Sequence, residues 1–264
     1  MPDYKSVCEK AARAGGAVLL EKLGKVEIRE KAPADLVTEA DLASQRCISQ
    51  IVLNAFPDHD VLGEEEMPDS PKITSAEYRW VIDPLDGTTN FVHKVPHFSV
   101  SVALQHGPRI LVGAVFNPIS KECYTAEAGG GAFLNGRPIC TSRVKKVNES
   151  LCGIGFPPGV RGDTPDLKAF LRVLPECQAL RRTGSAALNL CYVAAGRFDA
   201  CWSFATKIWD MAAGTLLVSE AGGVVTPPDD AGECLESGHF IACSTPELHE
   251  SLMPLIGGKN NVAG

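Results

Sequence analysis

The segment from residue 80 to residue 91 restricts the fold of this chain more than any other, and it reads W-V-I-D-P-L-D-G-T-T-N-F. Its apolar start predicts a buried strand that ends in a carboxylate, Asp83, with Pro84 stiffening the exit. A second carboxylate, Asp86, follows, and Gly87 permits another backbone to approach closely. Two carboxylates at one strand end repel each other unless a cation lies between them. Mg²⁺ suits such an oxygen site, although Asp-Pro-x-Asp-Gly is also favourable turn chemistry by itself.

Three other acidic segments favour a metal site over a simple turn. Gly63-Glu64-Glu65 follows a short apolar stretch, just as Asp83 follows the apolar residues 80–82. Residues 35–41 and 209–214 each open a predicted helix and carry acidic side chains there. The simpler interpretation of these two segments is N-terminal capping, because the helix dipole favours acidic side chains in the first turn.

Composition and charge exclude several classes of protein. Of the 264 residues, 45% are hydrophobic, which is enough for a large core. The net charge of −7 argues against binding to nucleic acid or to anionic membranes, and a metal ion is one way to attract an anionic substrate. The ten cysteines contain no C-x-x-C pair and mostly lie in apolar stretches, which is typical of buried thiols in a reducing cytoplasm. No stretch is long and apolar enough to span a bilayer, so we expect a cytoplasmic protein.

The apolar spacing predicts helices and strands in mixed order. The expected helices cover residues 4–23, 38–56, 185–195, 210–221 and 246–256, and the expected strands 61–63, 80–82, 98–104, 110–116, 122–127, 198–203, 224–225 and 240–241. Asn135-Gly136 predicts a hairpin. Because strands and helices do not alternate strictly, layered α/β or α+β sheets are favoured over a barrel. We expect one domain over 1–264, with possible subdomains 1–150 and 151–264 and a Gly- and Pro-rich boundary near 155–165.

Other catalytic motifs have little support. The chain has no G-x-S-x-G elbow and no phosphate-binding G-x-x-x-x-G-K-[ST] loop. His93 and His97 are interrupted by Pro96, which disfavours a helical zinc pair and predicts surface or packing roles. Thr88 is expected to cap a helix after Gly87, where the N–H groups of both residues can face a phosphate.

Taken together and in order, the motifs resemble those of the inositol monophosphatase family, within the metal-dependent, lithium-sensitive phosphatases. The resemblance covers nearly the whole chain and rests on D-L-V-T-E-A-D, G-E-E, W-V-I-D-P-L-D-G-T-T-N-F, A-G-G-G-A-F-L-N, G-S-A-A, W-D-M-A-A-G and E-A-G-G. It implies a layered αβαβα sandwich, commonly a homodimer, with two or three Mg²⁺ ions per active site.

The resemblance also implies roles for individual residues. The metal ligands would be Glu64, Asp83, the carbonyl of Leu85, Asp86 and Asp210. The catalytic residues would be Asp41 and Thr88, which position and activate a water for in-line attack, and Glu65, which supports the site or a third metal. The substrate-binding residues would be Asp86, Gly87, Thr88, Gly184, Ser185 and Ser203.

One position departs from the family pattern and bears on the substrate. Many relatives have an acidic residue seven positions before the last metal-binding Asp, where it contacts inositol hydroxyls, and this chain has Ser203.

The resemblance implies a Mg²⁺-dependent phosphomonoesterase that acts on a small polyol or sugar phosphate. The alternatives are fructose-1,6-bisphosphatase, 3′-phosphoadenosine-5′-phosphate phosphatase and histidinol-phosphatase activity. A substrate with two phosphates would need a second basic pocket, which Arg181, Arg182 or Lys207 would have to line. A non-catalytic phosphate-sensing module is the alternative from another class. No nucleic acid or membrane partner is expected.

Overall fold

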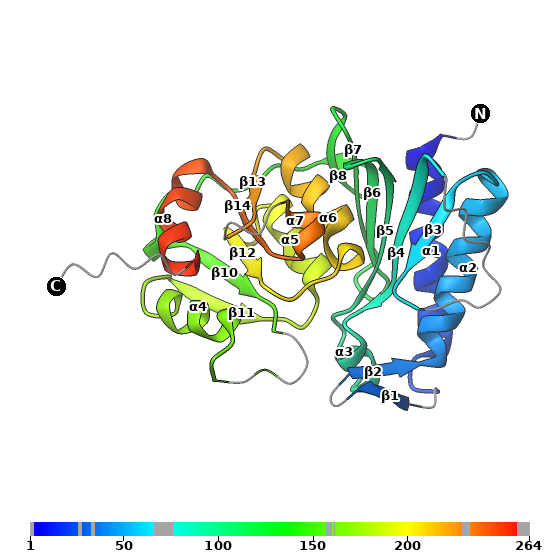
Figure 1. The fold of residues 1–264 in the computed structure, drawn as a ribbon, viewed down its shortest axis with the longest axis horizontal. Coiled ribbons are helices and arrows are strands. Elements are labelled where there is room, and N and C mark those ends of the chain that lie inside the picture. The colour runs from blue at the N-terminus through cyan, green and yellow to red at the C-terminus, as the bar shows by residue number, and fades with distance from the viewer. Residues whose placement is uncertain are drawn as a thin grey trace.

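The computed structural model describes residues 3–25, 28–32, 35–65, 76–156, 160, 162–228 and 233–257, with the backbone alone for 28–32 and 35–37. The described elements stack as an αβαβα sandwich, which confirms the predicted fold class (Figure 1). The outer helices on one side are α1 (Tyr4–Lys22) and α2 (Glu39–Ala55). The middle helices are α5 (Ala186–Ala194), α6 (Ile208–Glu220) and α7 (Cys234–Ser237). The outer helices on the other side are α4 (Pro165–Val173) and α8 (Pro246–Gly257).

The first sheet lies between the N-terminal helices and the middle layer. Its strands follow one another in chain order, as β3 (Asp60–Gly63), β4 (Tyr78–Asp86), β5 (Ser99–His106), β6 (Arg109–Asn117), β7 (Glu122–Glu127), β8 (Gly131–Leu134) and β9 (Arg137–Pro138). β3 is parallel to β4, and the other neighbouring strands are antiparallel. Asn135 and Gly136 have φ angles of 49° and 76°, which confirms the predicted hairpin turn.

The second sheet lies between the middle layer and the helices α4 and α8. Its spatial order is β11 (Ala179–Arg182), β10 (Leu151–Ile154), β12 (Ala200–Ser203), β14 (Phe240–Cys243) and β13 (Val224–Thr226). The small elements are the pair β1 (Ile28–Ala32) and β2 (Asp35–Thr38), the short helix α3 (Thr88–Val92) and a 3₁₀ turn at Val147–Glu149.

The change from one sheet to the other comes earlier than the Gly- and Pro-rich segment. β9 ends at Pro138 in the first sheet, and β10 already belongs to the second sheet at Leu151. Of the segment 155–165, residues 157–159 and 161 lie outside the described part of the chain. Where any subdomain boundary falls stays a prediction.

The strand expected to end at Asp83 is longer than predicted. β4 continues to Asp86, and its pairing with β5 shifts register because Asp83 pairs with Ser101 whereas Asp86 pairs with Ser99. The extra residue is a bulge that contains Pro84, whose missing N–H makes such an interruption tolerable. As a result, both carboxylates stay on the strand and lie at the same end of the sheet.

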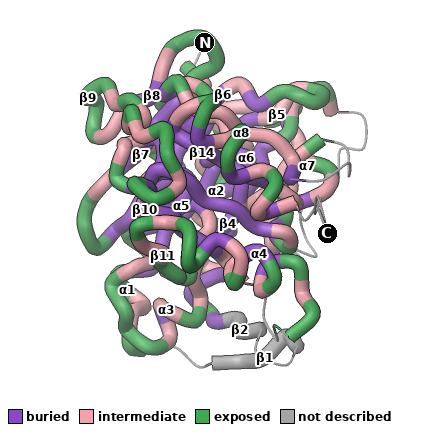
Figure 2. Tube along the Cα trace, turned by 90° about the vertical axis from the view of Figure 1, so that its left-hand side faces the viewer, coloured by how far each residue is buried: buried purple, intermediate pink, exposed green. Residues whose placement is uncertain are grey.

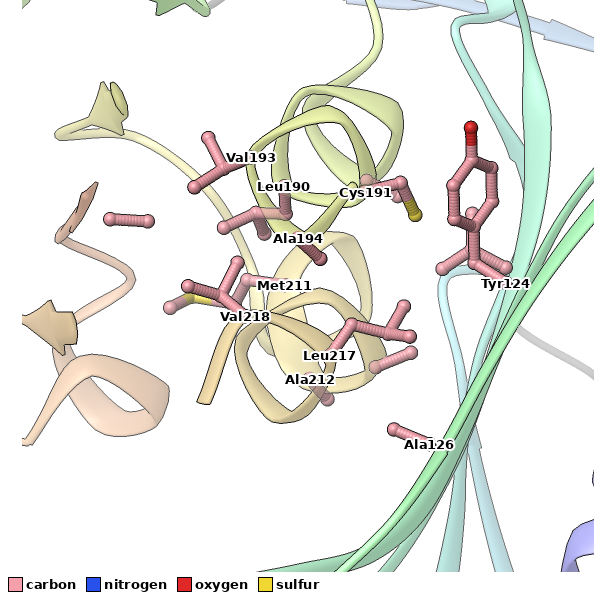
Figure 3. Close-up of a cluster of buried hydrophobic side chains, with 14 of the residues drawn as sticks. Tyr124, Ala126, Leu190, Cys191, Val193, Ala194, Met211, Ala212, Leu217 and Val218 are labelled. Atoms are coloured by element: carbon pink, nitrogen blue, oxygen red, sulfur yellow. The ribbon is translucent and has the colours of Figure 1, made fainter. Parts of the chain in front are cut away.

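The middle helices are buried between the two sheets. Figure 3 shows Cys191 of α5 and Tyr124 of β7 turned toward each other, with Val193 and Val218 on the far side of the helices. In Figure 2 the chain is coloured by burial, and buried residues are found along β4, α5 and β14. Because α5 and α6 are covered on both sides, their sequences are apolar almost all round.

Two glycine-rich motifs are joined by one carboxylate. Glu220, at the end of α6, accepts hydrogen bonds from the N–H groups of Gly129 and Gly131, each at 2.8 Å. The turn between β7 and β8 is therefore tied to the middle layer. Within the described ranges, no helix combines the length and the apolar character needed to cross a membrane.

Candidate active site

Asp83 lies near the end of β4, and its side chain is only 1% exposed. One carboxylate oxygen, Oδ1, accepts the N–H of Leu85 at 2.9 Å. Burial raises the pKa of Asp83 well above its ordinary value, and the nearby charges of Glu64, Asp86 and Asp210 raise it further. Each of these charges is another carboxylate, so the surroundings of Asp83 concentrate negative charge away from water.

Asp210 approaches the same point from the first turn of α6. Its carboxylate accepts the N–H of Lys207 at 2.7 Å. Burial raises the pKa of Asp210 to about 7, with further contributions from Asp86 and Glu64. Asp210 therefore adds negative charge beside Asp83 and Asp86, which a cation would neutralise.

Asp86 joins the first sheet to the middle layer through its carboxylate. Oδ2 accepts hydrogen bonds from the hydroxyl of Ser99 at 3.1 Å, from the hydroxyl of Ser185 and from the N–H of Ala187 at 3.0 Å. Oδ1 accepts the N–H of Ala186 at 3.1 Å. Burial raises the pKa of Asp86, and the Ser185 hydroxyl opposes that shift. The first turn of α5, in the middle layer, thus holds a carboxylate that belongs to the first sheet.

Asp41 and Thr88, predicted to act together, lie close to each other. The hydroxyl of Thr88 is 3.4 Å from Oδ1 of Asp41 and donates to the carbonyl of Leu85 at 3.1 Å. Asp41 is 1% exposed, accepts the N–H and hydroxyl of Thr38 at 2.8 and 2.7 Å, and has a pKa raised to about 6 by burial. The expectation that Thr88 caps the next helix is wrong. Gly87 occupies the cap position of α3 with φ at 96°, and the Thr88 hydroxyl is directed to Leu85 and Asp41 instead.

Glu64 and Glu65 leave the end of β3 beside β4. The N–H of Glu64 donates to the carbonyl of Ile82 at 3.1 Å. The side-chain amide of Gln45, on α2, makes two hydrogen bonds with the backbone of Glu65. Its oxygen accepts the Glu65 N–H at 3.0 Å, and its nitrogen donates to the Glu65 carbonyl at 2.5 Å. The charge of Glu65 raises the pKa of Asp41, and the charge of Glu64 raises the pKa of Asp83.

The residues predicted to contact substrate fall into two groups. Gly87 and Gly184 face each other, since a Cβ added to Gly87 would lie 3.1 Å from the carbonyl oxygen of Gly184. Ser185 is the N-cap of α5, and its hydroxyl accepts the N–H of Leu188 at 3.2 Å. Ser203 is 3% exposed at the end of β12, and its hydroxyl accepts the N–H of Ala205 at 3.3 Å.

The chemistry of these donors fits a hard divalent cation. The four side chains Glu64, Asp83, Asp86 and Asp210 offer carboxylate oxygens, which Mg²⁺ prefers. As the side chains stand in the described part of the chain, no three His, Cys, Asp or Glu residues already form a metal-binding group. Binding an ion would therefore require the four carboxylates to turn toward it.

Sequence reasoning missed several residues that hold the site. Ser99 and Gln45 are polar residues on a mostly apolar strand and helix face, which is a weak signal of a buried polar contact. Asn90 lies within the motif of residues 80–91 and received no separate role. His97 packs edge-on against Tyr192, with ring centroids 5.7 Å apart, which agrees with its predicted packing role.

Comparison with known proteins identifies the family to which the chain belongs. The sequence matches the inositol monophosphatase family over residues 3–259. It is 42% identical over 255 residues to the inositol-1-monophosphatase of Rhizobium meliloti, with 95% of each chain covered. It is also 42% identical over 253 residues to the Nus factor SuhB of Pseudomonas aeruginosa, with 93% of each chain covered. A solved structure of inositol monophosphatase from Anabaena superposes with a TM-score of 0.85 at 35% identity, covering 98% of this chain and 97% of that one. The chain therefore belongs to the inositol monophosphatase family.

Proposed function

We propose that this phosphoric monoester hydrolase is Mg²⁺-dependent and acts on a small polyol or sugar monophosphate. The observation that carries the proposal is the group of carboxylates at the ends of β3 and β4 and the start of α6, in which Asp83 and Asp86 are buried and Glu64 and Asp210 are half-buried. Asp83 is 1% exposed, and the charges acting on it are those of Glu64, Asp86 and Asp210. Such a group is costly to bury without a cation, and an anionic phosphate can approach it only when positive charge is present.

The proposed metal ligands are Glu64, Asp83, Asp86 and Asp210, with the carbonyl of Leu85. When bound, Mg²⁺ would neutralise charge on the phosphoryl oxygens and lower the pKa of a bound water. Thr88 would orient the attacking water through its hydroxyl, which already contacts Asp41 at 3.4 Å.

The remaining protein contribution is positioning, which together with electrostatics accounts for most catalysis of phosphoryl transfer. The N–H groups of Gly87 and Thr88 would donate to phosphate oxygens, and Glu65 would support the site from β3. Gly184 and Ser185 would line the pocket for the alcohol portion of the substrate.

Phosphate release from a panel of esters tests this function. The panel contains inositol 1-phosphate, fructose 1,6-bisphosphate, 3′-phosphoadenosine 5′-phosphate and histidinol phosphate, each assayed for kcat/KM. We expect turnover to fall at least about hundredfold in EDTA, to return with Mg²⁺ and to be inhibited by Li⁺. Turnover that is unchanged by EDTA would contradict the metal dependence. Phosphate binding without turnover of any ester would instead favour a sensing module.

Ser203 provides a test of substrate choice. In Ser203→Glu, a carboxylate would replace a buried hydroxyl that now accepts the N–H of Ala205. A charge-assisted hydrogen bond to a polyol is worth about 1.5–3 kcal/mol, so we expect about a tenfold rise in kcat/KM for inositol 1-phosphate relative to glycerol 2-phosphate. Ser203→Gln controls for size without charge. An unchanged ratio would show that this position does not select the substrate.

A bisphosphate substrate would require a second cationic pocket. Arg181 and Arg182 are exposed on the edge strand β11, and the guanidinium of Arg182 lies over the ring of Phe156 at 5.8 Å. A preference for the two bisphosphates in the panel would assign these arginines that role.

We further propose a cytoplasmic homodimer, as the family resemblance implies. All ten cysteines fall within the described part of the chain and are free thiols, which supports a reducing compartment. Exposed Leu171 and Leu174 on α4 supply apolar surface for a second copy. The net charge of −7 favours neither a nucleic acid nor an anionic membrane as partner.

A further inference from the structure

The side chain of Asn90 links two segments that come from different sheets. Its amide nitrogen, Nδ2, donates to the carbonyl of His97 at 2.7 Å and to the carbonyl of Thr183 at 2.9 Å. Asn90 lies on α3, directly after β4 of the first sheet, whereas Thr183 follows β11 of the second sheet. One amide group therefore spans the boundary between the two halves of the molecule.

The backbones on either side of this link are in close contact. A Cβ added to Gly184, which has φ at 87°, would lie 2.9 Å from Nδ2 of Asn90. A Cβ added to Gly87 would lie 3.1 Å from the carbonyl oxygen of Gly184 and 3.2 Å from that of His97. Because two glycines meet here, backbone and the Asn90 amide occupy the space that side chains would otherwise fill. The Asn90 amide therefore sets the position of the Thr183–Gly184 backbone.

The segment held by Asn90 leads directly to the donors that hold Asp86. Ser185 follows Gly184, and its hydroxyl and the N–H groups of Ala186 and Ala187 all donate to the Asp86 carboxylate. The orientation of that carboxylate therefore depends on where the first turn of α5 is placed. The position of that turn depends in part on the hydrogen bond from Asn90 to Thr183.

We propose that Asn90 is a positioning residue that sets the orientation of Asp86, and with it the affinity for Mg²⁺, by clamping the Thr183–Ser185 segment. The proposal rests on the function proposed above, in which Asp86 is a metal ligand. Asn90 itself is not among the proposed ligands of the metal or the substrate. Its effect passes through the backbone of Gly184 to the cap of α5, and partners that orient a metal ligand typically contribute 10–100-fold in metal affinity.

Mg²⁺ binding to the metal-free protein, measured by titration calorimetry, tests the proposal. Asn90→Ala removes both donors, and Asn90→Asp keeps the shape but places a carboxylate oxygen against two carbonyls. We expect the Kd for Mg²⁺ to rise about tenfold in both variants. The matched control is Asn117→Ala, because the Asn117 side chain also makes two hydrogen bonds, to the N–H groups of Ile119 and Ser120, in a turn of the first sheet. Its Kd should stay within about twofold of wild type.

A double-mutant cycle separates a positioning role from general destabilisation. Asn90→Ala and Ser185→Ala both act through Asp86, so their effects on the Kd for Mg²⁺ should be less than additive in the double variant, whereas Asn117→Ala and Ser185→Ala should add. At saturating Mg²⁺, kcat of Asn90→Ala should recover to within about threefold of wild type, because the change is in metal affinity. If Asn90→Ala folds poorly, the same titration on Asn90→Ser, which retains one donor, should show a smaller rise in Kd.

Three results would overturn the proposal. These are an unchanged Kd in the Asn90 variants, an equal rise in Asn117→Ala, and full additivity with Ser185→Ala. Absence of Mg²⁺ binding by the wild-type protein is a different result, which would refute the proposed function and the role of Asn90 with it.

Discussion

Asp83→Asn is expected to lower kcat/KM by about a thousandfold, because losing a metal ligand removes several kcal/mol of transition-state stabilisation. The same change should stabilise the metal-free protein by about 1 kcal/mol, since a buried carboxylate among other carboxylates opposes folding. Asp83 is 1% exposed, and the negative charges of Glu64, Asp86 and Asp210 repel its carboxylate. A neutral amide at this position would remove that repulsion. Steady-state kinetics and urea unfolding in EDTA measure the two effects.

The opposite signs of these effects distinguish a metal ligand from a structural carboxylate. Asp199 is the matched control, because it is 8% exposed and accepts the N–H of Leu151 at 2.7 Å and the hydroxyl of Ser142 at 2.5 Å. Asp199→Asn should lower stability and leave the Mg²⁺ dependence of activity unchanged. Near-normal turnover in Asp83→Asn would remove Asp83 from the proposed site.

Gly113→Ala is expected to lower the free energy of unfolding by about 3 kcal/mol. Gly113 lies on β6, where a Cβ would be 2.8 Å from the Cα of Ala213 on α6. Because the obstacle is backbone, the methyl group can fit only if α6 moves away from the sheet. α6 also carries Asp210 in its first turn, so we expect activity and Mg²⁺ affinity to fall together with stability.

Gly162→Ala is the control for this substitution, since a Cβ at Gly162 would meet no atom within 4 Å. Its free energy of unfolding should change by no more than about 0.5 kcal/mol. If Gly113→Ala were as mild as Gly162→Ala, the close packing of α6 on the first sheet would not contribute to stability.

Periodic apolar residues were the reliable signal for long elements. The helices predicted at 4–23 and 38–56 are present as α1 and α2, because each buries a continuous apolar stripe against the first sheet. The edge strand β11 was not predicted, and the short helix α3 was expected only as the helix that Thr88 would cap. β11 ends in the exposed pair Arg181 and Arg182, so it has no alternating apolar pattern to read.

The end of β4 shows a different reason for a wrong boundary. Pro84 is an expected strand terminator, yet the strand passes it through a bulge and ends at Asp86. Similarly, Thr88 has the composition of a helix cap, but its hydroxyl is directed to Leu85 and Asp41. In both cases a tertiary contact outweighs a local preference, and local sequence carries no information about that contact.

The amino-acid order alone determined the layered fold class, the family and the acidic segments from which the proposed site is drawn, because motifs and apolar periodicity are local properties of the chain. The tertiary structure decided how those segments meet. It places the start of α5, in the middle layer, on Asp86 of the first sheet, and Asn90 on the carbonyl of Thr183. Hydrogen bonds between residues about a hundred positions apart depend on how the layers pack, and no pattern within either segment encodes them.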